Sequence, residues 1–115
     1  MTSTDFHSKL KTLTQSHESF LIRPNPIAPE HSTSLFQRYA HPVITADHIP
    51  LDWRYDLNPS TNPHLLERLT INAVFNPGAI EWNNKFLLVC RVEGVDRKSF
   101  FAIAESANGI DNFRF

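Results

Sequence analysis

The stretch "VCRVEGVDRKSFFAIAES", residues 89–106, gathers charged side chains between two apolar runs. Arg91, Glu93, Asp96, Arg97 and Lys98 lie close together, although the whole chain has 11 basic and 12 acidic residues and is almost neutral. A charge at the end of a covered strand needs a partner or a ligand, because its desolvation otherwise costs free energy. These residues therefore indicate either a ligand site or a local cluster of ion pairs.

A ladder of ion pairs across a hairpin, for instance Arg91 with Glu105, would account for the charges without a ligand. Carboxylates are the remaining candidates for chemistry, and cleavage of a glycosidic bond needs one beside the scissile oxygen. Those in or next to predicted strand ends are Glu93, Asp96, Glu105 and Asp111. Their spacing does not select one of them.

Other chemistries lack a sequence signature. The six histidines show neither the H-x-H nor the H-x-x-x-H spacing that metal sites usually contain, so we expect no metal. Cys90 lies inside the apolar run "FLLVCRV" and is predicted to be a small core residue rather than a nucleophile. All three glycines lie at predicted turns, and none belongs to a phosphate-binding loop.

The bulk composition indicates one small soluble domain. The length is 115 residues and the net charge is −1, with no basic stripe, so we expect neither a nucleic acid nor a membrane surface as partner. No apolar run approaches the roughly 18 residues of a membrane span. The first residues, "MTSTDFHSKL", lack a secretory hydrophobic region, which predicts a cytoplasmic protein.

The N-terminal segment has helical periodicity. Its apolar positions are Phe6, Leu10, Leu13, Phe20 and Leu21. They predict a helix from Asp5 to Ser19 that ends at the proline-rich run "RPNPIAPE". The next segment, "SLFQRYAHPVIT", is predicted to be extended, with Pro42 confining it to an edge or a bulge.

Residues 48–69 are predicted to form a long ordered loop with one helical turn at Leu65 to Arg68. Trp53, Arg54 and Tyr55 either pin this loop to the core or line a pocket, and composition favours the first alternative.

From Ile71 onward the pattern changes to strands. The pair Asn83-Asn84 between two apolar runs predicts a tight hairpin, and Gly94 to Arg97 a second turn. The result is a meander of three to four antiparallel strands. The strand Phe86 to Glu93 begins apolar on both sides, which predicts an inner strand covered on both faces.

The blocks "NAVFNPGAI", "RVEGVDRKSFFAIAES" and "NGIDNFRF" closely resemble the N-terminal part of glycoside hydrolase family 130, in particular its phosphorylases of 4-O-β-D-mannosyl-D-glucose. The resemblance spans nearly the whole chain. It implies a mainly β fold, with an N-terminal helix and extended arm (residues 1–70) followed by roughly the first blade (residues 71–115) of an incomplete five-bladed β-propeller. The implied reaction is an inverting phosphorolysis to α-D-mannose 1-phosphate and glucose. Inorganic phosphate is the co-substrate, and no metal or organic cofactor is implied.

The resemblance also implies roles for individual residues. Asn76 and Arg91 would hold the mannosyl unit, and Arg97 would lie at the subsite of the departing glucose. The residues expected to orient these arginines are Glu93, Asp96 and Lys98. The general acid of the family lies beyond the last matching block, so we expect no catalytic residue in this chain.

We therefore expect an N-terminal fragment that is inactive alone and either poorly folded or self-associating. Its expected partners are the remainder of the propeller, the disaccharide and phosphate, and the complete protein is expected to form a homo-oligomer. Three alternatives stay open: a phosphorylase of β-1,4-mannooligosaccharides, a β-mannoside hydrolase of the same family, and a non-catalytic remnant.

Overall fold

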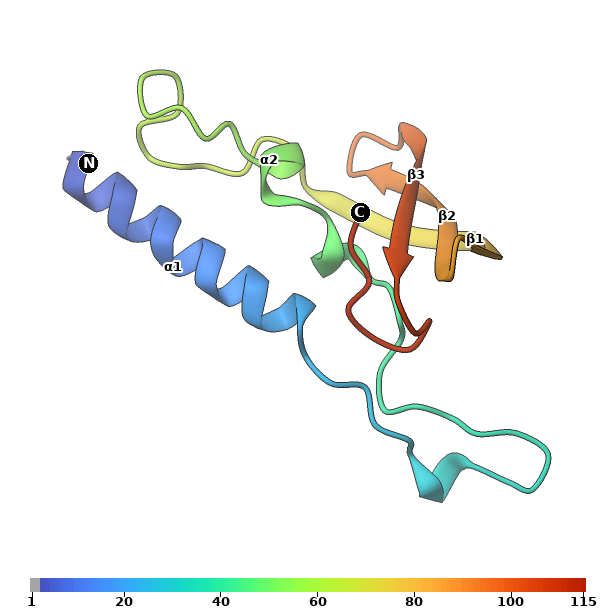
Figure 1. Ribbon diagram of the computed structural model, residues 1–115. Coiled ribbons are helices and arrows are strands. Elements are labelled where there is room, and N and C mark those ends of the chain that lie inside the picture. Colours follow the sequence, from blue (N-terminus) through green and yellow to red (C-terminus); the bar gives the residue numbers. More distant parts are fainter. Residues whose placement is uncertain (1–2) are drawn as a thin grey trace.

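The computed structural model describes residues 3–115 and contains a long N-terminal helix, an irregular middle region and a small sheet (Figure 1). The helical elements are α1 (Ser3–Leu21), the 3₁₀ turns η1 (Pro29–His31) and η2 (Ala46–His48), and α2 (Leu51–Arg54). The strands are β1 (Ile71–Trp82), β2 (Lys85–Gly94) and β3 (Ser99–Ser106).

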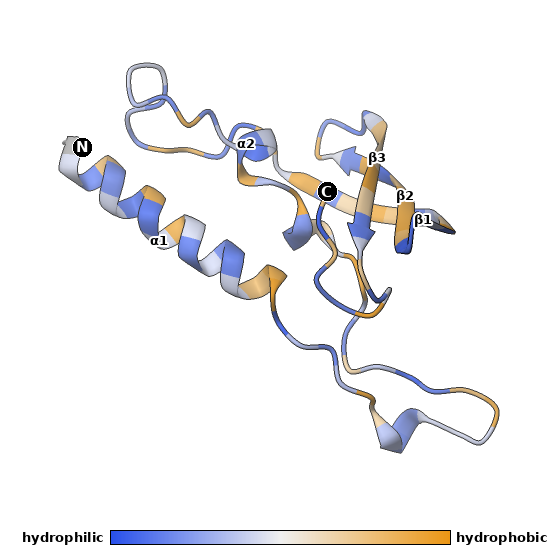
Figure 2. Cartoon of the chain, viewed as in Figure 1, coloured by the Kyte–Doolittle hydropathy of each residue, from blue (hydrophilic) through white to orange (hydrophobic). Residues whose placement is uncertain are grey.

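Helix α1 confirms the predicted helix and extends it by two residues at each end. Phe6 and Leu21 are buried, whereas most of the helix surface is polar and exposed (Figure 2). Near its C-terminal end the Phe20 ring contacts the ring of His48, with centroids 4.8 Å apart. No helix between residues 3 and 115 is long and apolar enough to cross a membrane.

The three strands form an antiparallel meander in the order β1-β2-β3, as the sequence predicts. Asn83 and Asn84 connect β1 to β2 with φ angles of 51° and 60°. Positive φ at both central residues is the signature of a type I′ turn, whose twist matches that of the flanking strands. The asparagine pair therefore sets the register of the first hairpin.

The core lies on one face of this sheet. Cys90, Val92 and Ala104 are fully buried there beneath Ile49 and Phe113. Burial raises the pKa of the Cys90 thiol, which keeps it protonated and unreactive at neutral pH. The predicted core position of Cys90 is confirmed.

The opposite face of the sheet is uncovered, so the prediction that β2 is covered on both sides is wrong for this chain. Val89 is 40% exposed, Ile103 58% and Phe101 77%. The segments that pack on the sheet, residues 43–49 and 113–115, both lie on the side of Cys90. We call the uncovered side the open face; its large apolar residues are Ile80, Trp82, Val89, Phe101 and Ile103.

The middle region differs from the prediction in two places. The segment "SLFQRYAHPVIT" forms no strand; Tyr39 alone makes a bridge, to Ile27. The helical turn predicted at Leu65 to Arg68 is also absent, because the Asn62 side chain takes over the local hydrogen bonds. Its amide nitrogen donates to the carbonyl of Leu66 at 2.9 Å, and its oxygen accepts from the Leu66 N–H at 3.0 Å.

The short helix of this region is α2 instead, and it fastens the loop to the sheet. The Trp53 ring contacts the rings of Phe100 and Phe115, at centroid distances of 6.0 and 5.7 Å. Arg54 Nε lies 2.8 Å from Glu67 Oε1 and so ties the two ends of the loop together. Trp53 and Arg54 thus pin the loop, which is the alternative favoured by composition.

The last segment contributes no full strand. Residue Arg114 alone pairs with β3, through two backbone hydrogen bonds of 2.8 and 3.0 Å to Glu105. The described sheet therefore has three strands, at the lower end of the predicted three to four.

Candidate functional site

A β-bulge in β1 turns Asn76 outward. The register of β1 against β2 slips between Phe75 and Gly78, so that Asn76 and Pro77 lie opposite the single residue Cys90. Asn76 has a φ angle of 50°, a left-handed conformation that asparagine tolerates better than most residues. Bulges commonly redirect a side chain next to a functional site. The Asn76 side chain is exposed and makes no hydrogen bond within residues 3–115.

Arg91 lies on β2, the central strand, near one end of the open face and between Phe75 on β1 and Phe101 on β3. Its guanidinium carbon is 5.1 Å from the centre of the Phe75 ring, and its Nε donates to Ser99 Oγ at 3.1 Å. Over the described part of the chain it makes no ion pair. The remaining N–H donors of the guanidinium are therefore free to bind a ligand.

The ion pair between Arg91 and Glu105 does not form. Glu105 is aligned with Leu87, four residues before Arg91 on β2. Its carboxylate instead lies 3.1 Å from the Lys85 amine. The ladder of ion pairs therefore does not explain why an arginine occupies position 91.

Arg97 occupies a strained position in the turn between β2 and β3. Its N–H donates to the carbonyl of Gly94 at 3.0 Å, and its φ angle is 67°. A left-handed conformation costs a non-glycine residue roughly 1 kcal/mol. Arg97 Nη1 lies 3.9 Å from Glu93 Oε1, which also accepts a hydrogen bond from Asn72 Nδ2 at 3.1 Å. Glu93 thus connects the turn to the start of β1.

Within the described residues, Asp96 and Lys98 make no ion pair or side-chain hydrogen bond with either arginine. Asp96 Oδ1 accepts a hydrogen bond from the backbone N–H of Lys98 at 3.0 Å and so shapes the turn. A Cβ atom at Gly94 would lie 2.9 Å from Asp96 Oδ1, which explains the glycine there. Of the three residues expected to orient the arginines, Glu93 alone contacts one of them within residues 3–115.

The sheet brings four of the predicted residues close together near the end of β2, with Asn76 directly after the strand partner of Arg91. Asn76 and Arg91 lie on adjacent strands, and Glu93 is two residues beyond Arg91 on the same face. Arg97 joins them through its contact with Glu93. The free donors of Arg91, the exposed amide of Asn76 and the exposed guanidinium of Arg97 suit a ligand with many oxygen acceptors. Their roles in binding stay a prediction.

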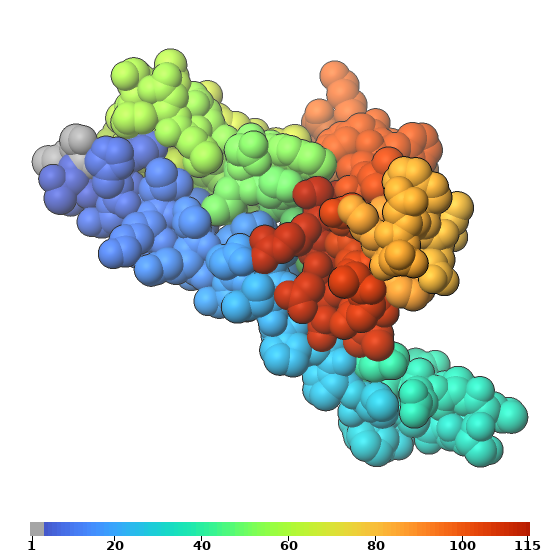
Figure 3. Space-filling view, viewed as in Figure 1, coloured from blue at the N-terminus to red at the C-terminus, as the bar shows by residue number. Residues whose placement is uncertain are grey.

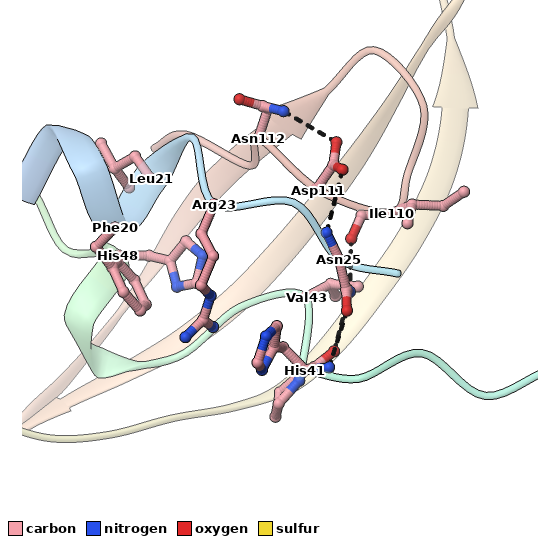
Figure 4. Close-up of a pocket in the computed structure, with 11 residues that line it drawn as sticks. Phe20, Leu21, Arg23, Asn25, His41, Val43, His48, Ile110, Asp111 and Asn112 are labelled. Carbon is pink, nitrogen blue, oxygen red and sulfur yellow. Dashed lines mark hydrogen bonds between the residues drawn. The ribbon is translucent and has the colours of Figure 1, made fainter. Parts of the chain in front are cut away.

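A second polar cluster, which the sequence did not reveal, joins the end of α1 to the C-terminal segment (Figure 4). The buried Asn25 donates from Nδ2 to the carbonyls of His41 and Ile110, at 3.0 and 2.9 Å, and its oxygen accepts from the His41 N–H at 2.8 Å. Asn108 and Asn112 donate to the Asp111 carboxylate and hold its pKa below the usual range. The sequence signal that could have indicated this cluster is the position of Asn25 between two prolines in "RPNP".

His48 is the buried histidine beside this cluster. Its Nδ1 accepts a hydrogen bond from the Thr45 N–H at 2.9 Å, and its ring packs on Phe20. Burial lowers the pKa of His48 below its ordinary value. The hollow next to it has a volume of only about 10 Å³, which is room for a water molecule but not for a sugar. This cluster is therefore structural, and the open face is the better candidate site.

Comparison with curated proteins shows what this chain is similar to. The chain is 55% identical, over 111 residues, to 4-O-β-D-mannosyl-D-glucose phosphorylase of Bacteroides fragilis. The predicted resemblance to a mannosylglucose phosphorylase is confirmed. The match covers 96% of this chain and 28% of the relative, so the chain spans little more than a quarter of that enzyme's length. No family model matches the chain.

Proposed function

We propose that these residues form the first sugar-binding segment of an inverting phosphorylase that cleaves 4-O-β-D-mannosyl-D-glucose with inorganic phosphate. The observation that carries this proposal is the closeness of Arg91 and Asn76 in adjacent strands, since Asn76 directly follows the strand partner of Arg91 and both side chains are exposed with unused hydrogen-bonding groups. The 55% identity to a phosphorylase of this specificity supports the same assignment. Membership of glycoside hydrolase family 130 is part of the proposal.

In the proposed reaction the oxygen of phosphate attacks the anomeric carbon of mannose from the face opposite glucose. The bond from that carbon to the bridging oxygen breaks, a bond to the phosphate oxygen forms, and the configuration inverts. The bridging oxygen takes a proton and leaves as the 4-hydroxyl of glucose. Arg91 and Asn76 hold the mannosyl unit, and Arg97 holds the departing glucose. The carboxylic acid that supplies the proton lies outside these 115 residues.

The three strands correspond, in this proposal, to most of the first blade of a five-bladed propeller. The open face, with Val89, Phe101 and Ile103 exposed, has the apolar character expected of a blade that packs on its neighbour. Residues 1–70 form the helix and arm that precede the blade.

Enzyme assays on the complete gene product test the proposal. Mannosylglucose should release glucose and α-D-mannose 1-phosphate only when inorganic phosphate is present. Glucose release that is independent of phosphate would instead identify a β-mannoside hydrolase. Faster phosphorolysis of β-1,4-mannooligosaccharides than of mannosylglucose would identify the alternative phosphorylase.

A non-catalytic segment that binds sugar without turnover is the second candidate, because the exposed groups of Asn76 and Arg91 suit sugar binding without any catalytic acid. The 115-residue chain should have no phosphorylase activity in either case. Titration of the isolated chain with mannosylglucose, followed by amide chemical shifts, separates the two. Shifts confined to the residues around Asn76, Arg91 and Arg97 would show that the segment binds sugar by itself.

A further inference from the structure

Two uncharged side chains, one from each neighbouring strand, hold the guanidinium of Arg91. Phe75 is its direct partner on β1, and the guanidinium carbon lies over the Phe75 ring at 5.1 Å from the ring centre. Ser99, at the start of β3, is aligned with Glu93 and therefore lies diagonally across from Arg91. Its hydroxyl oxygen accepts the hydrogen bond from Arg91 Nε at 3.1 Å. Direct and diagonal partners on one face of a sheet are within reach of a long side chain, which explains both contacts.

These two contacts restrict the guanidinium but leave its terminal nitrogens unused. The ring attracts the cation through its quadrupole, which limits movement of the group away from β1. The hydrogen bond at Nε limits rotation of the group about the side-chain axis. The N–H groups on Nη1 and Nη2 of Arg91 make no hydrogen bond within residues 3–115. An ordered guanidinium loses less side-chain entropy when these groups bind a ligand.

Neither contact neutralises the charge of Arg91. The carboxylate of Glu93, two residues further along the same face, is engaged elsewhere. Its Oε1 accepts a hydrogen bond from Asn72 Nδ2 at 3.1 Å and lies 3.9 Å from Arg97 Nη1. A carboxylate paired with Arg91 would accept from its terminal nitrogens in a bidentate arrangement. The hydroxyl of Ser99 instead orders the group and leaves both its charge and those donors to a ligand.

This end of the sheet is open to a ligand. Figure 3 shows the turn that joins β2 to β3, in orange, at the surface of the molecule. Arg91 and Ser99 are exposed, and Phe75 is half-buried. A hydrogen bond between exposed side chains contributes little to stability, because water replaces it when it is lost. Removal of the Ser99 hydroxyl should therefore change the orientation of Arg91 more than the stability of the fold.

We infer that Phe75 and Ser99 are positioning residues of the sugar site. They hold the Arg91 guanidinium in one orientation, with its terminal N–H groups free for the hydroxyl oxygens of the mannosyl unit. The inference rests on the proposed function, in which Arg91 contacts that unit. It assigns the orientation of Arg91 to uncharged side chains rather than to the expected acids, Glu93 and Asp96.

Steady-state kinetics of the complete enzyme test the role of Ser99. Ser99→Ala should lower kcat/KM for mannosylglucose by about threefold to tenfold and leave the KM for phosphate unchanged. Ser99→Thr keeps the hydroxyl and should retain most of the activity. Ser99→Asp should be more damaging than Ser99→Ala, because a carboxylate pairs with the guanidinium and takes its terminal donors. Ser60→Ala, at an exposed serine in the loop before β1, is the matched control and should leave kcat/KM unchanged.

The contact with Phe75 is tested in the same way. Phe75→Leu removes the ring and should lower kcat/KM by about threefold, whereas Phe75→Tyr keeps the ring and should retain most of the activity. Thermal unfolding profiles that match the wild type would show that each variant is folded.

A double-mutant cycle separates positioning from a structural role. Ser99→Ala should cost nothing further in the Arg91→Ala background, because Ser99 acts only through Arg91. An equal cost in both backgrounds would overturn the inference. Full activity of Ser99→Ala beside an impaired Arg91→Ala would overturn the inference alone. Full activity of Arg91→Ala would overturn the proposed function and the positioning role together.

A crystal structure of the Ser99→Ala enzyme gives a measure that does not depend on activity. The Arg91 guanidinium should occupy a different orientation, or more than one, once the acceptor at Nε is removed. A guanidinium that keeps its wild-type orientation in this variant would show that Ser99 does not position it.

Discussion

The two faces of the sheet are nearly equal in apolar sequence and unequal in structure. On the covered face Cys90, Val92 and Ala104 are fully buried by segments of the same chain. On the open face Val89 and Ile103 stay exposed. The next open-face residue of β2 after Val89 is the charged Arg91, whereas the covered face continues with the apolar Val92. The difference teaches that alternation identifies which residues share a face, while the chain segments available to pack on each face decide which is buried.

The largest expected effect comes from placing a charge on each face in turn. Val92→Asp should abolish cooperative unfolding of the chain, because an unpaired carboxylate in the core costs roughly 3 kcal/mol or more. The matched change Val89→Asp, three residues earlier on the open face, should alter the free energy of unfolding by less than about 1 kcal/mol. Thermal denaturation followed by circular dichroism measures both. Equal damage from the two substitutions would mean that the open face is also packed.

Exposure of the open face should make the isolated chain self-associate, because the apolar patch and the strand edges are both unprotected. Phe101→Asp should remove the larger species from size-exclusion profiles without changing the circular dichroism spectrum. A wild-type chain that elutes as a sharp monomer would contradict this expectation, and would show that the open face needs no cover.

Substitution of Arg91 tests whether the charged end of the open face is functional. In the complete enzyme, Arg91→Ala should reduce kcat/KM by about ten- to a hundredfold, which corresponds to the loss of a charge-assisted hydrogen bond of roughly 1.5–3 kcal/mol. Arg91→Lys should be almost as damaging, because lysine lacks the planar fork of donors. Lys85→Ala is the control on the same face. If lysine restores most of the activity at position 91, the side chain acts only as a charge.

A smaller effect, about tenfold, is expected for Arg97→Ala in the synthetic direction, and it should appear in the Michaelis constant for glucose. The side chain is 84% exposed and its contact with Glu93 is long, so it contributes little to stability. Arg97→Gly should additionally stabilise the turn by up to about 1 kcal/mol, because glycine adopts a φ angle of 67° without strain. An unchanged Michaelis constant in both variants would remove Arg97 from the glucose subsite.

The free energy of unfolding should depend on pH through His48, which is buried beside the covered side of the sheet. Burial lowers its pKa in the folded state from the ordinary value of 6.5, so the folded chain binds fewer protons than the unfolded chain. Its contribution is fully present above pH 6.5 and is lost as the pH falls below that value. The charged and titratable groups around it are Arg23, Asp47 and His17.

The free energy of unfolding, measured against pH for the wild type and His48→Gln, tests this expectation. In the variant, most of the decline in the free energy of unfolding below pH 6.5 should be absent. Burial lowers the pKa of His17 in the same way, so His17→Gln is the matched control and should account for the remainder. A decline that is identical in the wild type and His48→Gln would show that His48 does not control it.

Local sequence determined the elements that depend on neighbouring residues. Helical spacing of apolar side chains predicts α1, and the Asn83-Asn84 pair predicts the first hairpin, because positive φ angles suit asparagine. The charged residues after Cys90 predict the candidate site. The blocks "NAVFNPGAI", "RVEGVDRKSFFAIAES" and "NGIDNFRF" predict the similarity to a mannosylglucose phosphorylase. Each of these signals lies within a few residues along the chain.

Tertiary structure decided what depends on residues far apart in sequence. Lys85 rather than Arg91 pairs with Glu105, 20 residues further along the chain, because of the strand register. The bulge at Asn76, directly after the strand partner of Arg91, arises where the register between β1 and β2 shifts by one residue. Alternation of apolar residues cannot indicate which face is left open, because coverage depends on where residues 43–49 and 113–115 return to the sheet.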